Sequence, residues 1–583
     1  MKLTGAEYIV KIIEQLDAEY LFAYPGGAVL PIYDALANTK LKCVLVRHEQ
    51  AASFAAQGYA RTMANKPGFC LSTSGPGATN MVTGIADAYA DSIPMIAITG
   101  QVASNLIGSD AFQEIDITGI CLPFTKKTYI LKDLSKAEAI FKEAYELTIN
   151  GRPGPVLIDI PKDVQNEIIE LSDDWATKFK QPESTRVYNA TPESLDKAIN
   201  LICKAEKPLI IGGHGIMLSG AVEEYRNFVE HEKIPAISTI FGIGALESEN
   251  PLYFSWLGMH GMKYANDAVQ QADVIIALGI RFDDRITGKL NEFAPNAHII
   301  HVDIDLSEGS KNVPTKVFIH ADLKTLLKGF PSMKTKKNEE SRKEWYNHLD
   351  NLRNQYPQKE ADYSKLTMVS ALDIVSKNRK DIIVATDVGQ HQMWAAQYCK
   401  NVKPYSFLTS GGLGSMGFGL PAAMGAQAAQ PNKEVWCVTG DGSFQMNLQE
   451  MITLVQEGWP VKILLLDNSY LGMVRQWQEQ FYERNYSGVD VMNPDYAALA
   501  DAYGIPCMSV DNVQDFEKAV QEAGKTDGPF LLHARVLKED NVYPMVPPQT
   551  SLSDTLYYPD VEVKANSKTT ESIKNESKEL LEN

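Results

Sequence analysis

Short runs of apolar, often β-branched residues alternate with segments of helical periodicity along most of the 583-residue chain. Between residue 1 and about residue 165, the runs include VLV, MIAITG and PVLIDI. Such continuous apolar runs are typical of strands in parallel sheets, which helices cover on both faces. The pattern predicts an α/β domain with a doubly wound sheet over residues 1–165.

The same alternation returns in two later blocks. Residues 190–330 contain PLIIGGHG, DVIIALGIRFDD and HIIHVDID, and residues 365–545 contain DIIVATD, EVWCVTGDG, VKILLLDN and FLLHARV. A polar stretch at about 166–190 predicts a linker, and the charged segment PSMKTKKNEESRKEW, which breaks the pattern, predicts a second domain boundary. We therefore expect three doubly wound parallel-sheet domains, with 546–583 as a polar tail or lid. No internal repeat is visible at the residue level.

The net charge and the cysteines of the chain indicate which partners it binds and in which compartment it works. The chain has 55 basic and 73 acidic residues and a formal charge of -18, which disfavours nucleic acid and anionic membranes as partners. No apolar run reaches the roughly 18 residues of a membrane helix, and the N-terminus does not resemble a signal peptide. The seven cysteines are scattered without a C-x-x-C pair, which indicates a reducing compartment. These features predict a cytoplasmic protein that acts on a small molecule.

Candidate chemistry appears where an apolar run, Val435 to Val438, leads into Gly440-Asp441-Gly442. Ligands of open α/β sheets bind at the carboxyl ends of strands, and glycines let the backbone come close to them. A carboxylate there would repel a phosphate unless a cation lay between them. Mg²⁺ prefers oxygen ligands, so we expect Asp441, the Asn468 amide oxygen and the Tyr470 carbonyl to bind it. The alternative is an ordinary Asp-Gly turn and an Asp-Asn helix cap.

The order and separation of these motifs resemble the thiamine-diphosphate signature, although this chain has Asp467-Asn468 where the family usually has two asparagines. Other runs narrow the resemblance to the acetohydroxyacid synthase (acetolactate synthase) large catalytic subunits, over about residues 3 to 550. They include STSGPGATN, TGQVASNLIGSDAFQE, RFDDRITGK, TSGGLGSMGFGLPAAMGA and LDNSYLGMVRQWQE. The resemblance implies thiamine diphosphate, Mg²⁺ and FAD as cofactors.

The resemblance also implies roles for individual residues. Glu49 would hydrogen-bond the cofactor's pyrimidine and promote removal of the C2 proton; the alternative is a helix-start glutamate that complements the helix dipole. Met416 would support the bent cofactor, although a methionine in an apolar stretch is more often plain core. The expected residues around thiamine diphosphate and its metal are Glu49, Gln390, His391, Gly414, Met416, Asp441, Gly442, Ser443, Asn468, Tyr470 and Met473.

For the substrates, the resemblance implies that Phe112, Gln113 and Lys162 of one chain line the channel of the other chain's site. Arg285 would bind the carboxylate of the second ketoacid, and Trp477 with Met259 and Met473 would form the acceptor pocket. A surface salt bridge and ordinary core packing are the alternatives. The expected FAD-binding residues are Arg152, Gly212, Gly213, Thr239, Met259, His260, Gly279, Arg281, Asp284, Asp303 and Asp322. His214 stands where the family has a glycine and could crowd the dinucleotide.

The implied activity is decarboxylation of pyruvate and condensation of the remaining two-carbon unit with a second 2-oxoacid, either pyruvate or 2-oxobutanoate. This reaction is the first common step of branched-chain amino acid biosynthesis. Because Glu49 and Asp441 lie in different blocks, the resemblance implies a homodimer or tetramer, and it leaves a small regulatory subunit open. Alternatives are a pyruvate oxidase, a catabolic FAD-independent acetolactate synthase, and a binding paralogue without catalysis.

Overall fold

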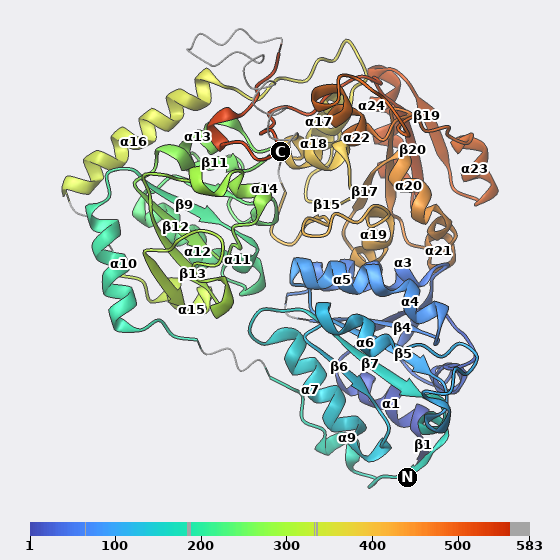
Figure 1. The fold of residues 1–583 in the computed structure, drawn as a ribbon. Coiled ribbons are helices and arrows are strands. Elements are labelled where there is room, and N and C mark those ends of the chain that lie inside the picture. Colours follow the sequence, from blue (N-terminus) through green and yellow to red (C-terminus); the bar gives the residue numbers. More distant parts are fainter. Residues whose placement is uncertain (65, 184–187, 332, 334–335, 401, 560–583) are drawn as a thin grey trace.

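The computed structural model describes residues 1–64, 66–183, 188–331, 333, 336–400 and 402–559. The chain forms three domains, and each contains a six-stranded parallel sheet with flanking helices, as the sequence predicts (Figure 1). In the described residues, no helix combines the length and the apolar character needed to cross a membrane.

The N-terminal sheet has the strand order β3-β2-β4-β5-β7-β6. Consecutive residues of its strands enter different cores: Ile96 and Ile98 pack with α1 and α7 on one face, whereas Met95 and Ala97 pack with α3 and α5 on the other. The elements of this domain are α1 (Gly5–Gln15), β2 (Tyr20–Ala23), α2 (Leu30–Leu36), β3 (Lys42–Leu45), α3 (Glu49–Thr62), β4 (Gly68–Ser72), α4 (Pro76–Asn80), α5 (Val82–Asp91), β5 (Met95–Gln101), α6 (Ile117–Cys121), β6 (Lys127–Ile130), α7 (Ala137–Ile149), β7 (Pro155–Pro161) and α8 (Lys162–Asn166).

The C-terminal sheet has the order β16-β15-β17-β18-β20-β19, which is the same connectivity as in the N-terminal sheet. The two outer domains therefore repeat one topology, although no repeat is visible in their residues. The elements are α17 (Met368–Asn378), β15 (Ile383–Thr386), α18 (Gln390–Tyr398), β16 (Phe407–Leu408), α19 (Gly419–Ala429), β17 (Val435–Gly440), α20 (Asp441–Asn447), α21 (Met451–Glu457), β18 (Lys462–Asp467), α22 (Gly472–Phe481), α23 (Tyr496–Ala502), β19 (Cys507–Val510), α24 (Val513–Lys525) and β20 (Phe530–Arg535).

The central sheet differs, with the order β11-β10-β9-β12-β13-β14. Counted within the domain, this is the 3-2-1-4-5-6 order of dinucleotide-binding folds. The elements are α10 (Pro192–Lys204), β9 (Pro208–Gly212), α11 (His214–Leu218), α12 (Val222–Glu232), β10 (Ala236–Ser238), β11 (Tyr253–Trp256), α13 (Lys263–Gln271), β12 (Val274–Leu278), α14 (Asp284–Thr287), β13 (His298–Asp303), β14 (Val317–His320), α15 (Leu323–Lys328) and α16 (Lys336–Gln355).

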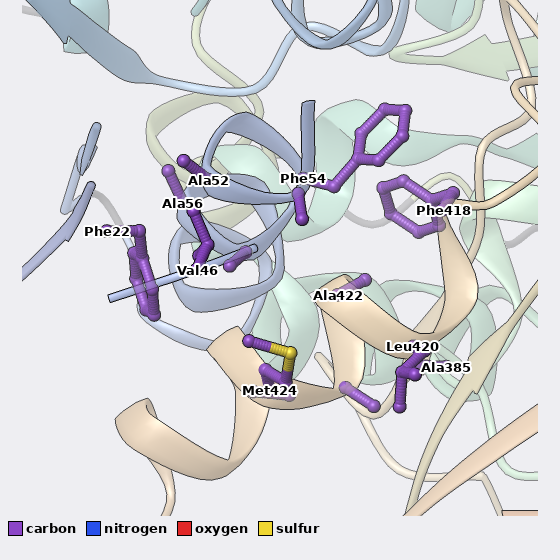
Figure 2. Close-up of a cluster of buried hydrophobic side chains, with 14 of the residues drawn as sticks. Phe22, Val46, Ala52, Phe54, Ala56, Ala385, Phe418, Leu420, Ala422 and Met424 are labelled. Carbon is purple, nitrogen blue, oxygen red and sulfur yellow. The ribbon is translucent and has the colours of Figure 1, made fainter. Parts of the chain in front are cut away.

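The outer domains share one hydrophobic core, in which α3 packs directly on α19 (Figure 2). Phe54 of α3 and Phe418, just before α19, meet edge to face with ring centroids 5.4 Å apart. Two glycines let the helix backbones approach: a Cβ on Gly58 would lie 2.0 Å from the Ala422 carbonyl oxygen, and one on Gly425 would lie 1.8 Å from that of Ala55. Any side chain at either glycine would push the helices apart.

The expected linker is partly folded. Strand β8 (Ile168–Glu170) pairs antiparallel with β1 (Lys2–Thr4), and α9 (Trp175–Lys178) follows it. The Trp175 ring packs edge to face on Tyr8 at 5.4 Å, and its indole N–H donates to Glu138 at 2.7 Å. This one aromatic residue docks a segment whose polar composition predicts a linker.

The expected tail at 546–583 also begins with a packed segment. Val546 and Leu552 are buried in a core of the central domain. Gln270 of α13 donates to Ser551, and Asn266 donates to Thr555. Residues 546–559 thus bind the C-terminal segment to the central domain, and 560–583 lie outside the described residues.

We predict that Gly425→Ala destabilises the protein by about 1–3 kcal/mol, because the new methyl group would overlap the Ala55 carbonyl. The gain in helix propensity from replacing a helical glycine, at most about 1 kcal/mol, does not offset this clash. The thermal unfolding midpoint measures the effect. Gly528→Ala is the matched control, since a Cβ there meets no atom within 4 Å, and an unchanged midpoint for Gly425→Ala would contradict the close approach.

Candidate functional site

The predicted cofactor motifs of the C-terminal domain meet where its strand order reverses. β17 pairs in parallel with both β15 and β18, and Gly440 lies opposite Leu466, so the ends of these three strands are neighbours, as expected. A cavity of about 80 Å³ opens at this edge. Its lining contains most of the residues predicted to hold thiamine diphosphate and its metal: Gln390, His391, Met416, Asp441, Gly442, Ser443, Asn468, Tyr470 and Met473.

Asp441 begins α20 and is almost fully buried. Burial raises the pKa of its carboxyl to about 7. The Asn493 side-chain N–H₂ donates to Asp441 Oδ2 and to Asp467 Oδ1, both at 2.8 Å. Burial also disfavours the charged form of Asp467, but His533, at 2.9 Å from Oδ2, together with the N–H and hydroxyl of Ser469, lowers the pKa of this carboxyl. Asn493 therefore holds together two acidic groups that would otherwise repel each other, and a cation would stabilise both.

Buried amides and an imidazole form the rest of the wall. Asn468 Nδ2 lies 3.4 Å from Gln390 Oε1, and Gln390 Nε2 donates to Gln476 at 2.9 Å. His391 is buried, which lowers the pKa of its imidazole to about 3, and its Nε2 has no hydrogen-bond partner among the described residues. A Cβ on Gly440 would lie only 2.7 Å from the His391 ring. The glycine thus leaves room for the imidazole ring at the end of β17.

These residues fit a magnesium diphosphate. They offer one carboxylate, amide and carbonyl oxygens, and a neutral imidazole in a buried pocket, which suits a cation that takes its other ligands from phosphate and water. The described part of the chain has no group of three or more His, Cys, Asp or Glu placed to bind a metal. A metal here would therefore depend on the phosphate oxygens.

Asp387 is a site residue that the sequence analysis missed. Its buried carboxylate accepts the backbone N–H groups of Val388, Gly417 and Gly419, at 2.8 to 3.2 Å. Burial raises the pKa of this carboxyl to about 6, while the three N–H bonds oppose that shift. Asp387 thus ties the loop that carries Met416 to the end of β15. The signal was its place at the end of a strand, in ATDVGQH, directly before the predicted diphosphate residues.

A second cavity, of about 580 Å³, lies between the three domains. The central domain contributes the loops after β9 and β12, at its own point of strand reversal, where dinucleotides bind in this topology. Arg152 reaches in from the N-terminal domain and pairs with Glu308 at 3.3 Å. The predicted FAD residues in its lining are Arg152, Thr239, Met259, His260, Gly279, Arg281, Asp284, Asp303 and Asp322.

Gly212 and Gly213, two further predicted FAD residues, are not in this lining and instead pack the turn behind it. A Cβ on Gly213 would lie 2.3 Å from the Gly279 carbonyl oxygen. His214 does line the cavity, but its ring stacks on Phe241 at 5.0 Å and its Nδ1 lies 3.1 Å from the Asp91 carbonyl oxygen. These two contacts fix the imidazole in the wall of the cavity.

The predicted substrate residues share this larger cavity. Arg285, Met259, Trp477 and Met473 all line it, together with Gly414. The Arg285 side chain is 58% exposed, its Nε lies 3.8 Å from the exposed Asp284 carboxylate, and its Nη1 lies 3.3 Å from the Met259 sulfur. Met473 and Val388 line both cavities, which places the small acidic cavity next to the large one.

The other predicted residues lie outside both cavities. Glu49 is the first residue of α3, at the end of the second strand of its sheet, and accepts a hydrogen bond from Asn80 at 2.9 Å. Phe112 is 88% exposed, Gln113 follows it with a φ of +62°, and Lys162 begins α8 on the surface. Neither lining contains any of the four. A single chain therefore brings together the cofactor and substrate residues without the predicted base.

Three segments of the chain match domains of one enzyme family. Residues 3–120 match the N-terminal TPP binding domain of thiamine pyrophosphate enzymes, residues 195–330 match the central domain, and residues 387–534 match the C-terminal TPP binding domain.

Individual proteins are similar over almost the full length. "Acetolactate synthase isozyme 2 large subunit" of Escherichia coli (strain K12) is 44% identical over 563 residues, covering 95% of this chain and 99% of that protein. "Acetolactate synthase large subunit" of Corynebacterium glutamicum is 44% identical over 568 residues, covering 95% and 90%. "Probable acetolactate synthase large subunit" of Methanococcus aeolicus is 43% identical over 578 residues, covering 95% of each.

We predict that Asn493→Ala weakens Mg²⁺-dependent binding of thiamine diphosphate by roughly 10- to 100-fold, because groups that orient metal ligands carry effects of this size. Tryptophan fluorescence during a Mg²⁺ titration at fixed cofactor concentration measures it. Asn378→Ala is the control, since this asparagine lies in the same domain, donates to the Ile374 carbonyl and lines neither cavity. Equal half-saturation points for the two variants would refute the role of Asn493.

Proposed function

The chain belongs to the acetolactate synthase large subunits within the thiamine pyrophosphate enzyme family, and on this basis we propose that it condenses two 2-oxoacids. Pyruvate is decarboxylated, and the two-carbon unit is joined to a second pyruvate or to 2-oxobutanoate. The observation that carries the proposal is the junction of the two cavities at Met473 and Val388. The small cavity with the predicted diphosphate residues adjoins the large cavity, which Arg285 and Trp477 line, and this supports the proposal.

Thiamine diphosphate supplies a carbanion-forming carbon and an electron sink for the decarboxylation. The chain's own task is to bind, orient and deprotonate it. Asp441, Asn468 and the Tyr470 carbonyl would hold Mg²⁺, and Gln390 and His391 would contact the diphosphate. Met416 would support the cofactor from the loop that Asp387 fixes. Arg285 would pair with the carboxylate of the second 2-oxoacid, a suitable role for an exposed guanidinium.

FAD is the occupant we propose for the rest of the large cavity. The strand order of the central domain is that of dinucleotide-binding folds, and Arg152 and Arg281 offer positive charge for a diphosphate. His260 is buried in the wall, and its Nδ1 has no hydrogen-bond partner among the described residues. These features favour the flavin-containing synthases over the FAD-independent catabolic ones.

A homodimer is the smallest unit that we propose. Glu49 lies outside the cavities of its own chain, and three apolar side chains of the same domain, Phe112, Leu106 and Leu122, are 88%, 43% and 63% exposed. Large exposed apolar side chains of this kind are suited to burial against a second copy. We propose that Glu49, Phe112, Gln113 and Lys162 complete the site of the partner chain. Pairing of dimers into tetramers and a small regulatory subunit remain proposals for the assembly, the latter because the relatives are named large subunits.

All seven cysteines are free, which favours a reducing compartment such as the cytoplasm.

We predict that the purified protein, given pyruvate, thiamine diphosphate, Mg²⁺ and FAD, releases CO₂ and forms 2-acetolactate. Adding 2-oxobutanoate should yield 2-aceto-2-hydroxybutanoate, and the bound flavin should be visible in the absorption spectrum. Mass spectrometry identifies the products. Hydrogen peroxide or reduced quinone in place of acetolactate would indicate a pyruvate oxidase, and the absence of any product would indicate a binding paralogue.

Glu49→Gln should slow exchange of the cofactor's C2 proton by roughly 100-fold or more, because the neutral amide cannot take part in proton transfer. Proton NMR of acid-quenched samples in deuterated water measures the exchange. Thiamine diphosphate should still bind, since Asp441 and its neighbours are unchanged. Exchange at the wild-type rate would remove Glu49 from the mechanism.

A further inference from the structure

The turn between α20 and α21 contacts the N-terminal domain at the residues on either side of Glu49. Glu450 Oε1 accepts the backbone N–H of Arg47 at 2.8 Å and that of His48 at 3.1 Å. Its Oε2 accepts the Thr453 hydroxyl at 2.8 Å, and the side chain is fully buried. One carboxylate of the C-terminal domain thus holds the two residues that directly precede Glu49.

A second side chain of the same turn holds the residue after Glu49. Asn447 Nδ2 lies 3.2 Å from the Gln50 side-chain oxygen, and it donates to the Gly417 carbonyl at 2.8 Å. Gly417 follows Met416, the predicted support of the cofactor. Asn447 therefore joins the start of α3 to the loop that lines the small cavity.

The bonds of Glu450 fix the backbone directly before the first residue of α3. Arg47 and His48 lead into α3, and His48 is its N-cap, so their positions determine where the first helical residue points its side chain. The two N–H groups also lie ahead of the first helical turn, where no helical carbonyl can accept them. Groups that take part in catalysis must be held within about 0.5 Å of their working geometry. The mechanism proposed above does not otherwise use the buried carboxylate of Glu450.

We propose that Glu450, assisted by Asn447, is a positioning residue that sets the orientation of Glu49 for proton transfer at the cofactor. This inference rests on the proposed role of Glu49. In the proposed dimer, Glu450 also lies close in sequence to a predicted metal ligand. Residues 441–450 begin with the metal ligand of one site and end with the support of Glu49, which serves the other site of the proposed dimer. A single short segment would therefore connect the two sites.

The test compares Glu450→Ala with Glu450→Gln in the full-length protein, with thiamine diphosphate and Mg²⁺ at saturation. The alanine variant should exchange the C2 proton roughly 10- to 100-fold more slowly than wild type, because a displacement of about 1 Å has effects of this size. The glutamine variant should stay within about threefold, since its amide oxygen can still accept both N–H groups. Cofactor affinity, measured by fluorescence, should be similar in all three proteins.

Asp273→Ala is the matched control. The Asp273 carboxylate also accepts two consecutive backbone N–H groups, those of Glu206 at 2.7 Å and Lys207 at 2.9 Å, but in the central domain. The Asp273→Ala protein should be less stable than wild type but should exchange the C2 proton of the cofactor at the wild-type rate. If Glu450→Ala does not fold, Asn447→Ala takes its place, with an expected loss of exchange of about threefold to tenfold.

Wild-type exchange in Glu450→Ala, or in Asn447→Ala where that variant is used, would overturn the positioning role. So would a loss of exchange that only follows a loss of cofactor affinity, or an equal loss in Asp273→Ala. Failure of the proposed function has a different signature. In that case Glu49→Gln exchanges the C2 proton at the wild-type rate, or the wild-type protein forms no acetolactate. Either result is independent of the exchange rates of the Glu450 variants.

Discussion

The close packing of α3 on α19 is the contact on which the arrangement of the outer domains depends. Gly58 and Gly425 bring two helix backbones so near that neither position tolerates a Cβ. Each of these helices starts beside a predicted site residue: Glu49 is the first residue of α3, and the Met416 loop precedes α19. The same apolar contact that joins two domains therefore also sets the distance between a predicted base and a predicted cofactor support.

Polar groups at the strand ends can be buried because each is matched by a partner. Asp441 and Asp467 share the Asn493 amide, Asp387 accepts three backbone N–H groups, and Glu450 accepts two. A buried carboxylate without such partners would take up a proton or be driven to the surface. Burial raises the pKa of both Asp441 and Glu450 to about 7, and Asp441 is the one predicted to receive a metal.

Two points of strand reversal, one in the C-terminal sheet and one in the central sheet, account for the two adjoining cavities. Both follow from chain topology, since neighbouring loops leave a crevice where successive strands depart to opposite sides. The central sheet presents its crevice toward the Ser410–Gly414 loop, and so one continuous space is lined by all three domains. The N-terminal domain contributes Arg152 to this space but directs Glu49 elsewhere, and this arrangement motivates the proposed homodimer.

The sequence by itself determined the three α/β blocks, because apolar runs and their spacing are local properties of the chain. It also determined the motif residues at the strand ends, since Gly440-Asp441-Gly442 and Asn468 are recognisable from residue type and order alone. Only the tertiary structure decided that Trp175 docks a polar linker, that Val546 and Leu552 bind the tail to the central domain, and that Asn493, Asp387 and Glu450 support the site. Each of these depends on a partner that is distant in the sequence. No local pattern encodes such a pairing, because it arises only when folding brings the two segments together.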